Sequence, residues 1–262
     1  MKPPLTYYGG KQMLSKLIIS LILKHNLYCE PFFGGGAVFF NKEPSPVEII
    51  NDTNGELINF YKVVKTQFRK LQKEISYTLH SRQYHQTAKI VIGYPELFDE
   101  VKRAWAIWVL SNQSFGSKLD DVWGYDFKNN TSAKRLNNKR VLFTKVYAGR
   151  LEQTQIECRD ALQVIESVDN KDCFFYCDPP YYNSHMGHYK GYTEKDFESL
   201  LQLLSKIKGK FLLSSYPSEL LEEYAKRNTW FTKKIEMPVT IPLNREAKPK
   251  MKTEVLTANY RI

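Results

Sequence analysis

The sequence predicts an α/β fold in which a doubly wound, mixed sheet is interrupted by a mainly helical insertion. A strand, a glycine-rich turn and a helix follow one another over residues 27–40, the usual order at the nucleoside-binding edge of such sheets. Strand patterns resume after residue 155 and end in an alternating pair typical of an antiparallel edge. Between them, helical periodicity continues for about 100 residues, which is too long for an ordinary loop. We therefore expect one domain made of residues 1–55 and 156–262, and a second, helical domain over 56–155.

The composition is that of an ordinary globular protein with an excess of positive charge. The 262 residues carry a formal net charge of +10, which favours a polyanionic partner, although a basic surface that serves only solubility is an alternative. No apolar run reaches the length of a membrane span, and the first residues lack a signal-peptide pattern, so we expect a cytoplasmic protein with no membrane partner. The cysteines fit neither a disulfide framework nor paired zinc ligands, and we expect buried free thiols at Cys29, Cys158, Cys173 and Cys177.

The first elements surround two glycine-rich turns. Gly9 and Gly10 permit a tight turn before a helix expected at about residues 12–24. A strand over 27–30 leads into the second turn, 31–36, and another helix is expected to open at 37–40. The second turn lacks the full spacing of a dinucleotide site, so by itself it is a weak signal.

An acidic residue at the end of the next strand strengthens this interpretation. Asp52 closes the strand 47–52 roughly 20 residues after the glycine turn, where doubly wound folds bind ribose hydroxyls. It would also serve as the N-cap of a helix over 53–65, and both roles are compatible.

The insertion carries a basic tract and a polar turn. Between Phe127 and Leu151 there are seven cations and no Asp or Glu, which fits phosphate contacts better than a solvated loop. The turn 111–117 is small and polar with one aromatic residue, and it is equally consistent with a purely structural turn.

The chain after the insertion alternates strands and helices. We expect strands at 155–160, 173–177 and 211–215, helices at 161–167 and 197–207, and an antiparallel pair near 230–237 and 252–260. Thr193 and Asp196 would cap the second of these helices. Asp160 lies between a strand and a helix, where it would cap the helix or contact a cofactor base.

The apolar run 173–177 ends in Asp178-Pro179-Pro180-Tyr181. The two prolines end the strand because they fix φ and lack backbone donors. A carboxylate, carbonyl oxygens and an aromatic ring then lie together, a set that accepts hydrogen bonds from an exocyclic amino group while the ring stacks on its base. A strand that merely ends in a Pro-Pro turn is the plainer alternative.

The loop 183–192 that follows would close over a bound nucleotide, and Tyr182 would either support the stacking ring or pack in the core. The loop contains His185 and His188, but no nearby carboxylate or cysteine completes a ligand set, so we expect no metal.

Five motifs occur along the chain in a specific order, with the glycine turns first, the insertion next and the proline tetrapeptide after it. They are Tyr7-x-Gly9-Gly10-Lys11, Glu30-Pro31-Phe32-x-Gly34-x-Gly36, Asn51-Asp52-x-Asn54, Asp178-Pro179-Pro180-Tyr181 and Thr253-Glu254-Val255-Leu256-Thr257-Ala258-Asn259-Tyr260. In type and order these motifs resemble those of the Dam-like, alpha-class adenine-N6 DNA methyltransferases, over nearly the whole chain.

This resemblance implies a methyltransferase (Rossmann-like) sheet that binds S-adenosyl-L-methionine, and an insertion that recognises double-stranded DNA. The cofactor-binding residues that it implies are Tyr7, Lys11, Glu30, Pro31, Phe32, Gly34, Gly36, Asp52, Asp160 and Asp178. The catalytic residues are Asp178, Pro179, Pro180 and Tyr181. The DNA-binding candidates, which combine a loose match in the turn with the basic tract, are Asn112, Gln113, Phe115, Lys134, Arg135, Lys139 and Arg140. The family often has Trp where this chain has Tyr7, which keeps an aromatic face.

The resulting hypothesis is methyl transfer to N6 of an adenine that is flipped out of the duplex. Asp178 and the Pro179 carbonyl would hold the amino protons, and Tyr181 would stack on the base. The alternatives are transfer to cytosine N4, to RNA adenine or to a protein amide, a silent DNA-binding module, and a dinucleotide-dependent oxidoreductase, which the glycine spacing disfavours. The sequence leaves open the target sequence, a companion restriction enzyme and the oligomeric state, for which we expect a monomer.

Overall fold

The computed structural model describes residues 1–7, 9–183, 191–238 and 251–262. By its internal contacts the chain divides into two compact units. The helical unit comprises Met1–Ile19, Gly34–Pro44 and Asp52–Cys158. The sheet unit comprises Ser20–Phe33, Ser45–Asn51 and Arg159–Ile262. Each unit therefore combines segments that lie far apart in the sequence. Whether these units coincide with the predicted domains of catalysis and target recognition stays a prediction.

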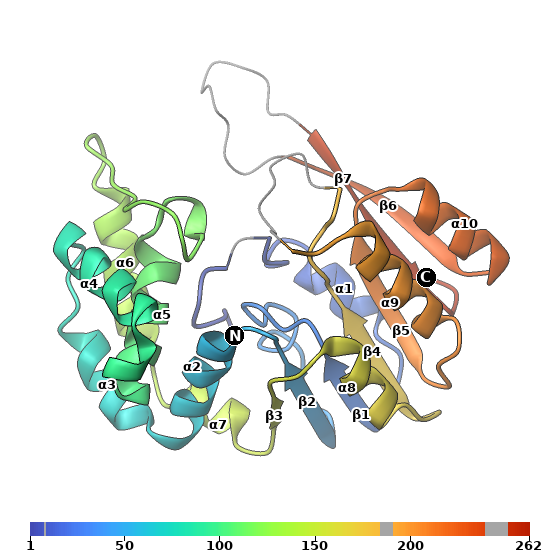
Figure 1. Cartoon of the computed structure of the whole chain (residues 1–262), viewed down its shortest axis with the longest axis horizontal. Coiled ribbons are helices and arrows are strands. Elements are labelled where there is room, and N and C mark those ends of the chain that lie inside the picture. The colour runs from blue at the N-terminus through green and yellow to red at the C-terminus, as the bar shows by residue number, and fades with distance from the viewer. Residues whose placement is uncertain (8, 184–190, 239–250) are drawn as a thin grey trace. The chain divides into compact units, whose positions relative to one another are not determined.

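The strands of the described residues form one seven-stranded mixed sheet in the order β3-β2-β1-β4-β5-β7-β6 (Figure 1). They are β1 (Leu27–Glu30), β2 (Val47–Asn51), β3 (Gln155–Glu157), β4 (Cys173–Cys177), β5 (Lys210–Ser215), β6 (Phe231–Pro238) and β7 (Met251–Ala258). The pairs β1–β2, β1–β4 and β4–β5 are parallel, and β7 runs antiparallel to both β5 and β6. The predicted α/β sheet and its antiparallel edge are confirmed. The strand order reverses between β1 and β4, and the carboxyl ends of strands at such a point are the usual ligand-binding edge.

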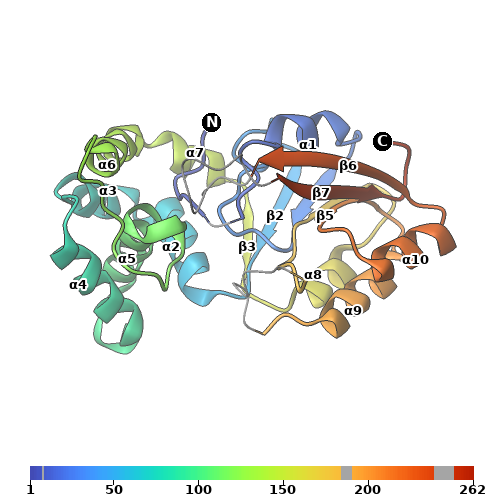
Figure 2. The same ribbon diagram turned by 90° about the horizontal axis from the view of Figure 1, so that it is seen from above.

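The helices α8 (Ala161–Val168), α9 (Glu194–Leu204) and α10 (Glu219–Arg227) lie on one face of the strands of the sheet unit (Figure 2). Their apolar side chains pack against strand residues that include Phe175 and Phe211, both fully buried. This burial of large apolar side chains provides the main driving force for the layer. The predicted capping box begins α9: the Thr193 hydroxyl accepts from the Asp196 N–H, and the Asp196 carboxylate accepts from the Thr193 N–H.

The helical unit confirms a mainly helical insertion (Figure 1). Its helices are α2 (Gly55–Thr66), α3 (Phe68–Ser76), α4 (Arg82–Gly93), α5 (Glu100–Gln113), α6 (Thr131–Leu142) and α7 (Val146–Leu151), with short 3-10 turns η1 (Pro95–Leu97) and η2 (Phe115–Ser117). Helix α5 packs against α2, α3 and α4, and it buries Trp105 and Trp108. No helix within the described residues is both long enough and apolar enough to cross a membrane.

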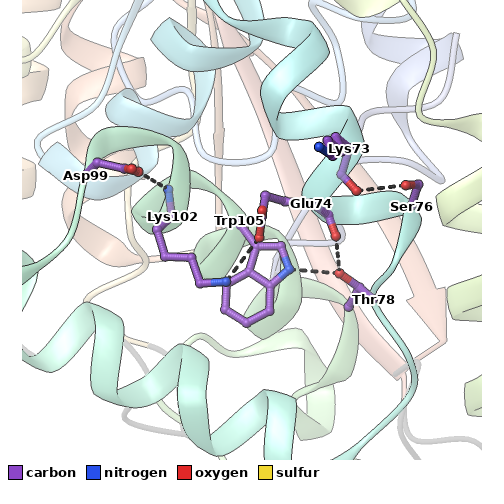
Figure 3. Close-up of polar contacts among 7 residues, drawn as sticks. All are labelled: Lys73, Glu74, Ser76, Thr78, Asp99, Lys102 and Trp105. Atoms are coloured by element: carbon purple, nitrogen blue, oxygen red, sulfur yellow. Dashed lines mark hydrogen bonds and ion pairs between the residues drawn. The ribbon is translucent and has the colours of Figure 1, made fainter.

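A polar network joins α3 to α5 (Figure 3). The Trp105 indole N–H donates to Thr78 Oγ1 at 2.8 Å, and the Thr78 hydroxyl donates to the Glu74 carbonyl at 2.9 Å. The Lys102 ammonium forms an ion pair with Glu74 at 3.1 Å and lies 3.8 Å from the centroid of the Trp105 ring. Asp99 caps α5 by accepting from the Lys102 N–H at 2.7 Å. The network holds the buried Thr78 in place, so its backbone carbonyl has a defined position.

Two predictions near the glycine turns need correction. Helix α1 spans Ser15–Leu21 and is shorter than the expected helix at 12–24. Residues 37–41 form turns and not a helix. The Asn41 side chain donates to the Ala37 carbonyl at 2.8 Å, and a side chain that binds the backbone in this way competes with helical hydrogen bonds.

The cysteines and the strand at residue 155 also differ in part from expectation. All four cysteines are free thiols and three are buried, but Cys158 is exposed. Strand β3 ends at Glu157, three residues earlier than predicted, so Cys158 lies outside the sheet.

Candidate active site

The second glycine turn lies against Tyr7 within the helical unit. Gly34 and Gly36 have φ angles of 50° and 66°, which L side chains rarely adopt. A Cβ on Gly35 would lie 2.7 Å from the Tyr7 Cβ, and a Cβ on Gly34 would lie 3.2 Å from the Tyr7 ring. The turn therefore requires glycine, and it brings three predicted residues, Tyr7, Gly34 and Gly36, into one group.

The Asp52 carboxylate fixes this turn. Its Oδ2 accepts from the Gly34 N–H at 2.8 Å, and its Oδ1 accepts from the Asn54 N–H at 2.9 Å. Asp52 is not the N-cap of α2, as one of its two predicted roles required, because Asn54 occupies that position and accepts the first backbone N–H groups of the helix. Burial raises the pKa of the Asp52 carboxyl, and its two backbone hydrogen bonds oppose that shift.

Lys11 and Tyr7 are held by the first glycine turn. The Gly10 N–H donates to the Tyr7 carbonyl at 3.0 Å, and a Cβ on Gly10 would lie 2.9 Å from that oxygen. The Lys11 side chain is buried, and its ammonium donates to the Gly9 carbonyl at 3.1 Å. A buried ammonium needs oxygen partners. The Lys11 ammonium is therefore a positive charge held at a defined place in this loop, and not a charge on a solvated side chain.

In the sheet unit, Asn51 joins the ends of two strands to the loop before α8. Its amide donates to the carbonyls of Pro31 and Arg159, at 2.9 and 3.0 Å, and its oxygen accepts from the Arg159 N–H at 2.9 Å. Glu30 is buried at the end of β1 and accepts from the Tyr28 hydroxyl at 2.7 Å. Asn51 belongs to one of the five motifs but had no predicted role, and its hydrogen bonds position the backbone around Pro31 and Arg159.

The segment Asp178–Tyr181 leaves the carboxyl end of β4, as predicted. The Tyr181 hydroxyl lies 3.2 Å from Asp178 Oδ1, and it also hydrogen bonds to Oε1 of Glu254 on β7. The Tyr181 ring meets the Tyr216 ring edge to face, with centroids 4.5 Å apart. Glu254 was not among the predicted site residues, because a hydrophobic pattern does not reveal the strand pairing that brings it to Tyr181.

The environment of this cluster keeps its phenols protonated. Burial, followed by the charges of Asp178 and Glu254, raises the pKa of Tyr181 well above its ordinary value. Tyr176 on β4 is shifted in the same direction by burial and by Asp178, and its hydroxyl lies 3.0 Å from Ser214 Oγ. The Tyr181 hydroxyl therefore acts as a hydrogen-bond donor over the physiological pH range.

Asp160, Phe32 and Tyr182 have structural contacts in the sheet unit. Asp160 is exposed and caps α8, where its Oδ1 accepts from two backbone N–H groups at 2.9 and 3.1 Å, so the capping alternative is confirmed. Phe32 and Tyr182 pack partly buried against the core, and the Tyr182 ring lies 5.5 Å from the ring of Phe197. Tyr182 thus has the core-packing role.

Gln113, a predicted DNA-binding residue, is buried in the helical unit. Its amide donates to the Leu79 carbonyl at 3.0 Å. Its oxygen accepts from the Ser81 N–H at 3.0 Å and from the Trp123 indole at 3.3 Å. These contacts favour the structural interpretation of the turn at this position.

Replacing Gln113 with alanine is therefore expected to lower the free energy of unfolding by about 2 kcal/mol, because three partly buried groups lose their partner. Thermal unfolding of the variant tests this, with the exposed Gln83 on α4 changed to alanine as the matched control. A variant that melts normally but binds DNA with a changed base preference would contradict the structural role.

Asn112 and Phe115 differ in exposure. Asn112 donates to the Trp108 carbonyl at 2.8 Å and accepts from the Thr6 hydroxyl at 3.1 Å, so it ties the first residues to α5. Phe115 is 54% exposed. Of the three candidates in this turn, only Phe115 presents its side chain to solvent.

Two cations of the predicted basic tract are anchored to the protein. The Lys139 ammonium donates to the Pro3 carbonyl at 3.1 Å, and burial, aided by two neighbouring cations, lowers its pKa to about 8. Arg140 donates to the Thr78 carbonyl at 3.0 Å, the group positioned by the α3–α5 network. Both side chains are only partly exposed.

Lys134 and Arg135 on α6 are exposed, and an aromatic pocket lies in the same unit. The pocket has a volume of about 220 Å³ and is lined by His80, Arg82, Trp123, Tyr125, Asp126, Phe127, Asn130 and Ser132. The Trp123 and Tyr125 rings stack with centroids 5.3 Å apart, and the Arg82 guanidinium lies 4.9 Å from the Trp123 centroid. Sequence analysis did not predict this pocket.

The predicted loop 183–192, with His185 and His188, includes residues 184–190, which lie outside the described residues. Across the described ranges, no group of three or more His, Cys, Asp or Glu side chains could hold a metal ion.

Comparison with known proteins gives matches over most of the chain. The family model for the D12 class N6 adenine-specific DNA methyltransferase matches residues 7–237. Type II methyltransferase M1.LlaDCHI of Lactococcus lactis subsp. cremoris is 29% identical, over 99% of this chain and 96% of that protein. Type II methyltransferase M.MjaIII of Methanocaldococcus jannaschii is 29% identical over 75% of each chain. DNA N-6-adenine-methyltransferase of Escherichia phage P1 is 27% identical over 74% of this chain, which corresponds to 27% of that longer protein.

Proposed function

The chain belongs to the D12 class N6 adenine-specific DNA methyltransferases, and from this membership we propose that it transfers a methyl group from S-adenosylmethionine to N6 of an adenine flipped out of duplex DNA. The observation that carries the proposal is the placement of Asp178–Tyr181 at the carboxyl end of β4, where the strand order reverses. We assign the cofactor to the glycine turn with Asp52, and the target amino group to the Asp178 cluster.

The residues of the glycine turns suit an adenosyl cofactor. Gly34 and Gly35 have no room for a Cβ beside Tyr7, so glycine at these positions lets the Tyr7 side chain pack directly on the backbone of the turn. Asp52 uses each carboxylate oxygen for one backbone N–H, and a carboxylate has further lone pairs for ribose hydroxyls. Lys11, Glu30 and Asp160 are the further candidates to line the pocket. When bound, the cofactor supplies an electrophilic methyl group on a sulfonium.

Asp178 and Pro179 would hold the amino group that receives the methyl. An exocyclic amine is a poor nucleophile because its lone pair is delocalised into the ring. Hydrogen bonds from its two protons to the Asp178 carboxylate and the Pro179 carbonyl favour a pyramidal nitrogen and direct its lone pair. Positioning of this kind supplies much of the acceleration, and no covalent enzyme intermediate is needed.

Tyr181 would stack on the flipped base. Its ring is held by two neighbours, the edge-to-face contact with Tyr216 and the hydroxyl contact with Glu254. A ring that is already oriented loses little further freedom when a base stacks on it. Stacking offsets part of the cost of taking the base out of the duplex.

The exposed cations Lys134 and Arg135 are the better candidates for phosphate contacts than the anchored Lys139 and Arg140. Changing both Lys134 and Arg135 to alanine is expected to weaken DNA binding about ten-fold at moderate salt and to reduce the slope of log K against log salt by about 2. The loss should be the same for every DNA sequence, since phosphate contacts carry no sequence information. Fluorescence anisotropy at several salt concentrations measures both quantities.

Lys70 and Lys73 on α3, changed to alanine together, remove the same charge from another helix of the unit and are the matched control. If the Lys70 and Lys73 variant loses as much DNA affinity as the Lys134 and Arg135 variant, the effect is due to net charge and not to specific phosphate contacts. A change that depends on the DNA sequence would show that Lys134 or Arg135 reads bases.

The proposed function is tested by mass spectrometry of nucleosides from DNA and RNA incubated with the chain and S-adenosylmethionine. N6-methyladenine formed in DNA alone is the expected result. Product on cytosine or in RNA would support one of the alternative substrates. Binding of DNA without any methylated product would support the silent binding module.

A further inference from the structure

The last motif of the chain, which contains Glu254, has no role in the proposed reaction. Glu254 lies on β7, an antiparallel strand that pairs with the end of β5 through Ser215 and Val255. Because β4 and β5 are parallel, the first half of β7, which begins its pairing at the carboxyl end of β5, lies at the same edge of the sheet as the carboxyl end of β4. A residue near the start of β7 is thereby brought to the edge of the sheet at which Asp178 lies.

The side chain of Glu254 is 1% exposed, and its contacts include Tyr181 and Lys252. Its Oε1 accepts a hydrogen bond from the Tyr181 hydroxyl. Its Oε2 lies 3.8 Å from the Lys252 ammonium. A carboxylate buried this deeply costs free energy unless it is paired, so the contacts of Glu254 matter for the structure around it.

The Tyr181 hydroxyl lies between two carboxylates and has one proton to donate. It lies 3.2 Å from Asp178 Oδ1, beyond the usual range for an O–H···O hydrogen bond, and it also hydrogen bonds to Glu254 Oε1. Glu254 is therefore the acceptor that binds the proton. If Glu254 were absent, the proton would turn to Asp178 and compete with the amino group of the substrate for the same oxygen.

We propose that Glu254 is a positioning residue, which holds the Tyr181 hydroxyl so that its proton does not bind Asp178 Oδ1 and its ring stays oriented for stacking. This inference rests on the proposed function, since it assigns Asp178 to the target amine. Glu254 acts only through Tyr181 and does not touch the substrate.

The test is a double-mutant cycle with Glu254→Ala, Tyr181→Phe and both together, measured as single-turnover methylation of a DNA duplex. Glu254→Ala is expected to lower the single-turnover rate constant about 30-fold with little change in the half-saturating DNA concentration, because it frees the Tyr181 proton to bind Asp178. Tyr181→Phe removes the hydroxyl, and with it both the proton and the hydrogen bond to Glu254, and should lower the same rate constant about five-fold. The double variant should match Tyr181→Phe, which means that removing the hydroxyl rescues the loss of Glu254.

Additive losses in the double variant would overturn the inference, since a merely structural Glu254 would not be rescued by losing a hydroxyl. Glu254→Gln keeps an acceptor for Tyr181 and should lose less than about five-fold. A Gln variant as slow as the Ala variant would also overturn it. If Glu254→Ala does not fold, as judged by thermal unfolding, the cycle is run with Glu254→Leu, which fills more of the space but also accepts no hydrogen bond from Tyr181, and additivity has the same meaning.

Glu236 on β6 provides the control, since it is an exposed glutamate that accepts a hydrogen bond from Thr253 at 2.6 Å, next to Glu254. Glu236→Gln should leave the rate unchanged, and an equal loss there would count against a specific role for Glu254.

A wild-type chain that forms no N6-methyladenine would defeat the proposed function itself. Additive losses in an active wild type would defeat only the role of Glu254.

Discussion

Replacing Asp178 with alanine is expected to lower kcat for methyl transfer by at least about 1,000-fold, while the affinity for DNA changes by less than about three-fold. The carboxylate leaves the end of β4, and its proposed contact is with the amino group that reacts. Removing it takes away an interaction that matters most in the transition state, so kcat falls and ground-state binding is largely kept. Single-turnover methylation and fluorescence anisotropy measure the two quantities separately.

Asp172 provides the matched control, because it is an exposed aspartate at the opposite end of the same strand. Asp172→Ala should methylate DNA at the wild-type rate. Residual turnover of the Asp178 variant above about 5% of wild type would contradict the assignment, since a positioning contact of this kind is worth far more. So would a loss of DNA affinity as large as the loss of rate.

Replacing Asp52 with alanine is expected to weaken binding of S-adenosylmethionine about 100-fold. Two effects combine: the ribose hydroxyls lose a charged acceptor, and the Gly34 and Asn54 N–H groups lose the partner that fixes the glycine turn. Isothermal titration calorimetry with the cofactor alone measures the affinity without reference to catalysis.

Asp99 is the control for the loss of a carboxylate that accepts a backbone N–H, because it caps α5 in the same unit. Asp99→Ala should cost stability but not cofactor affinity. The raised pKa of Asp52 gives a second readout: as the pH falls, this carboxyl takes up its proton before an ordinary aspartate does, so wild-type affinity should begin to fall at a higher pH than usual for Asp. If the affinity for S-adenosylmethionine stays constant over the pH range in which Asp52 takes up its proton, Asp52 does not contact the ribose.

Much of the fold could be read from local patterns. The apolar run Cys173–Cys177, closed by two prolines, predicts a buried strand with a definite end, and β4 has those bounds. The capping box at Thr193 is likewise a local signal, and it was found in place. Prediction was less accurate where local signals competed. The apolar run 37–40 was expected to open a helix, but the Asn41 side chain hydrogen bonds to the Ala37 carbonyl, which a helix would use.

The site was less predictable because much of it depends on pairing between distant segments. Glu254 and Tyr181 are brought into contact by the position of β7 in the sheet, which no hydrophobic pattern specifies. Gln113 has the polar character of a DNA-reading residue, but its partners come from Leu79, Ser81 and Trp123, so only the folded unit shows that it is structural. Whether the remaining predicted contacts hold cofactor and DNA depends on the experiments above.

The place of β7 between β5 and β6 has a consequence for the newly made chain. The ribosome makes β7 after the other six strands of the described sheet. Strands β5 and β6 therefore lack their hydrogen bonds to β7 until the end of synthesis. A nascent polypeptide that already displays Asp178–Tyr181 still lacks Glu254, and so lacks the group that holds Tyr181. Translation that stalls before Glu254, or proteolysis that removes β7, would leave a chain in which Asp178–Tyr181 is intact and the contact between Glu254 and Tyr181 is missing.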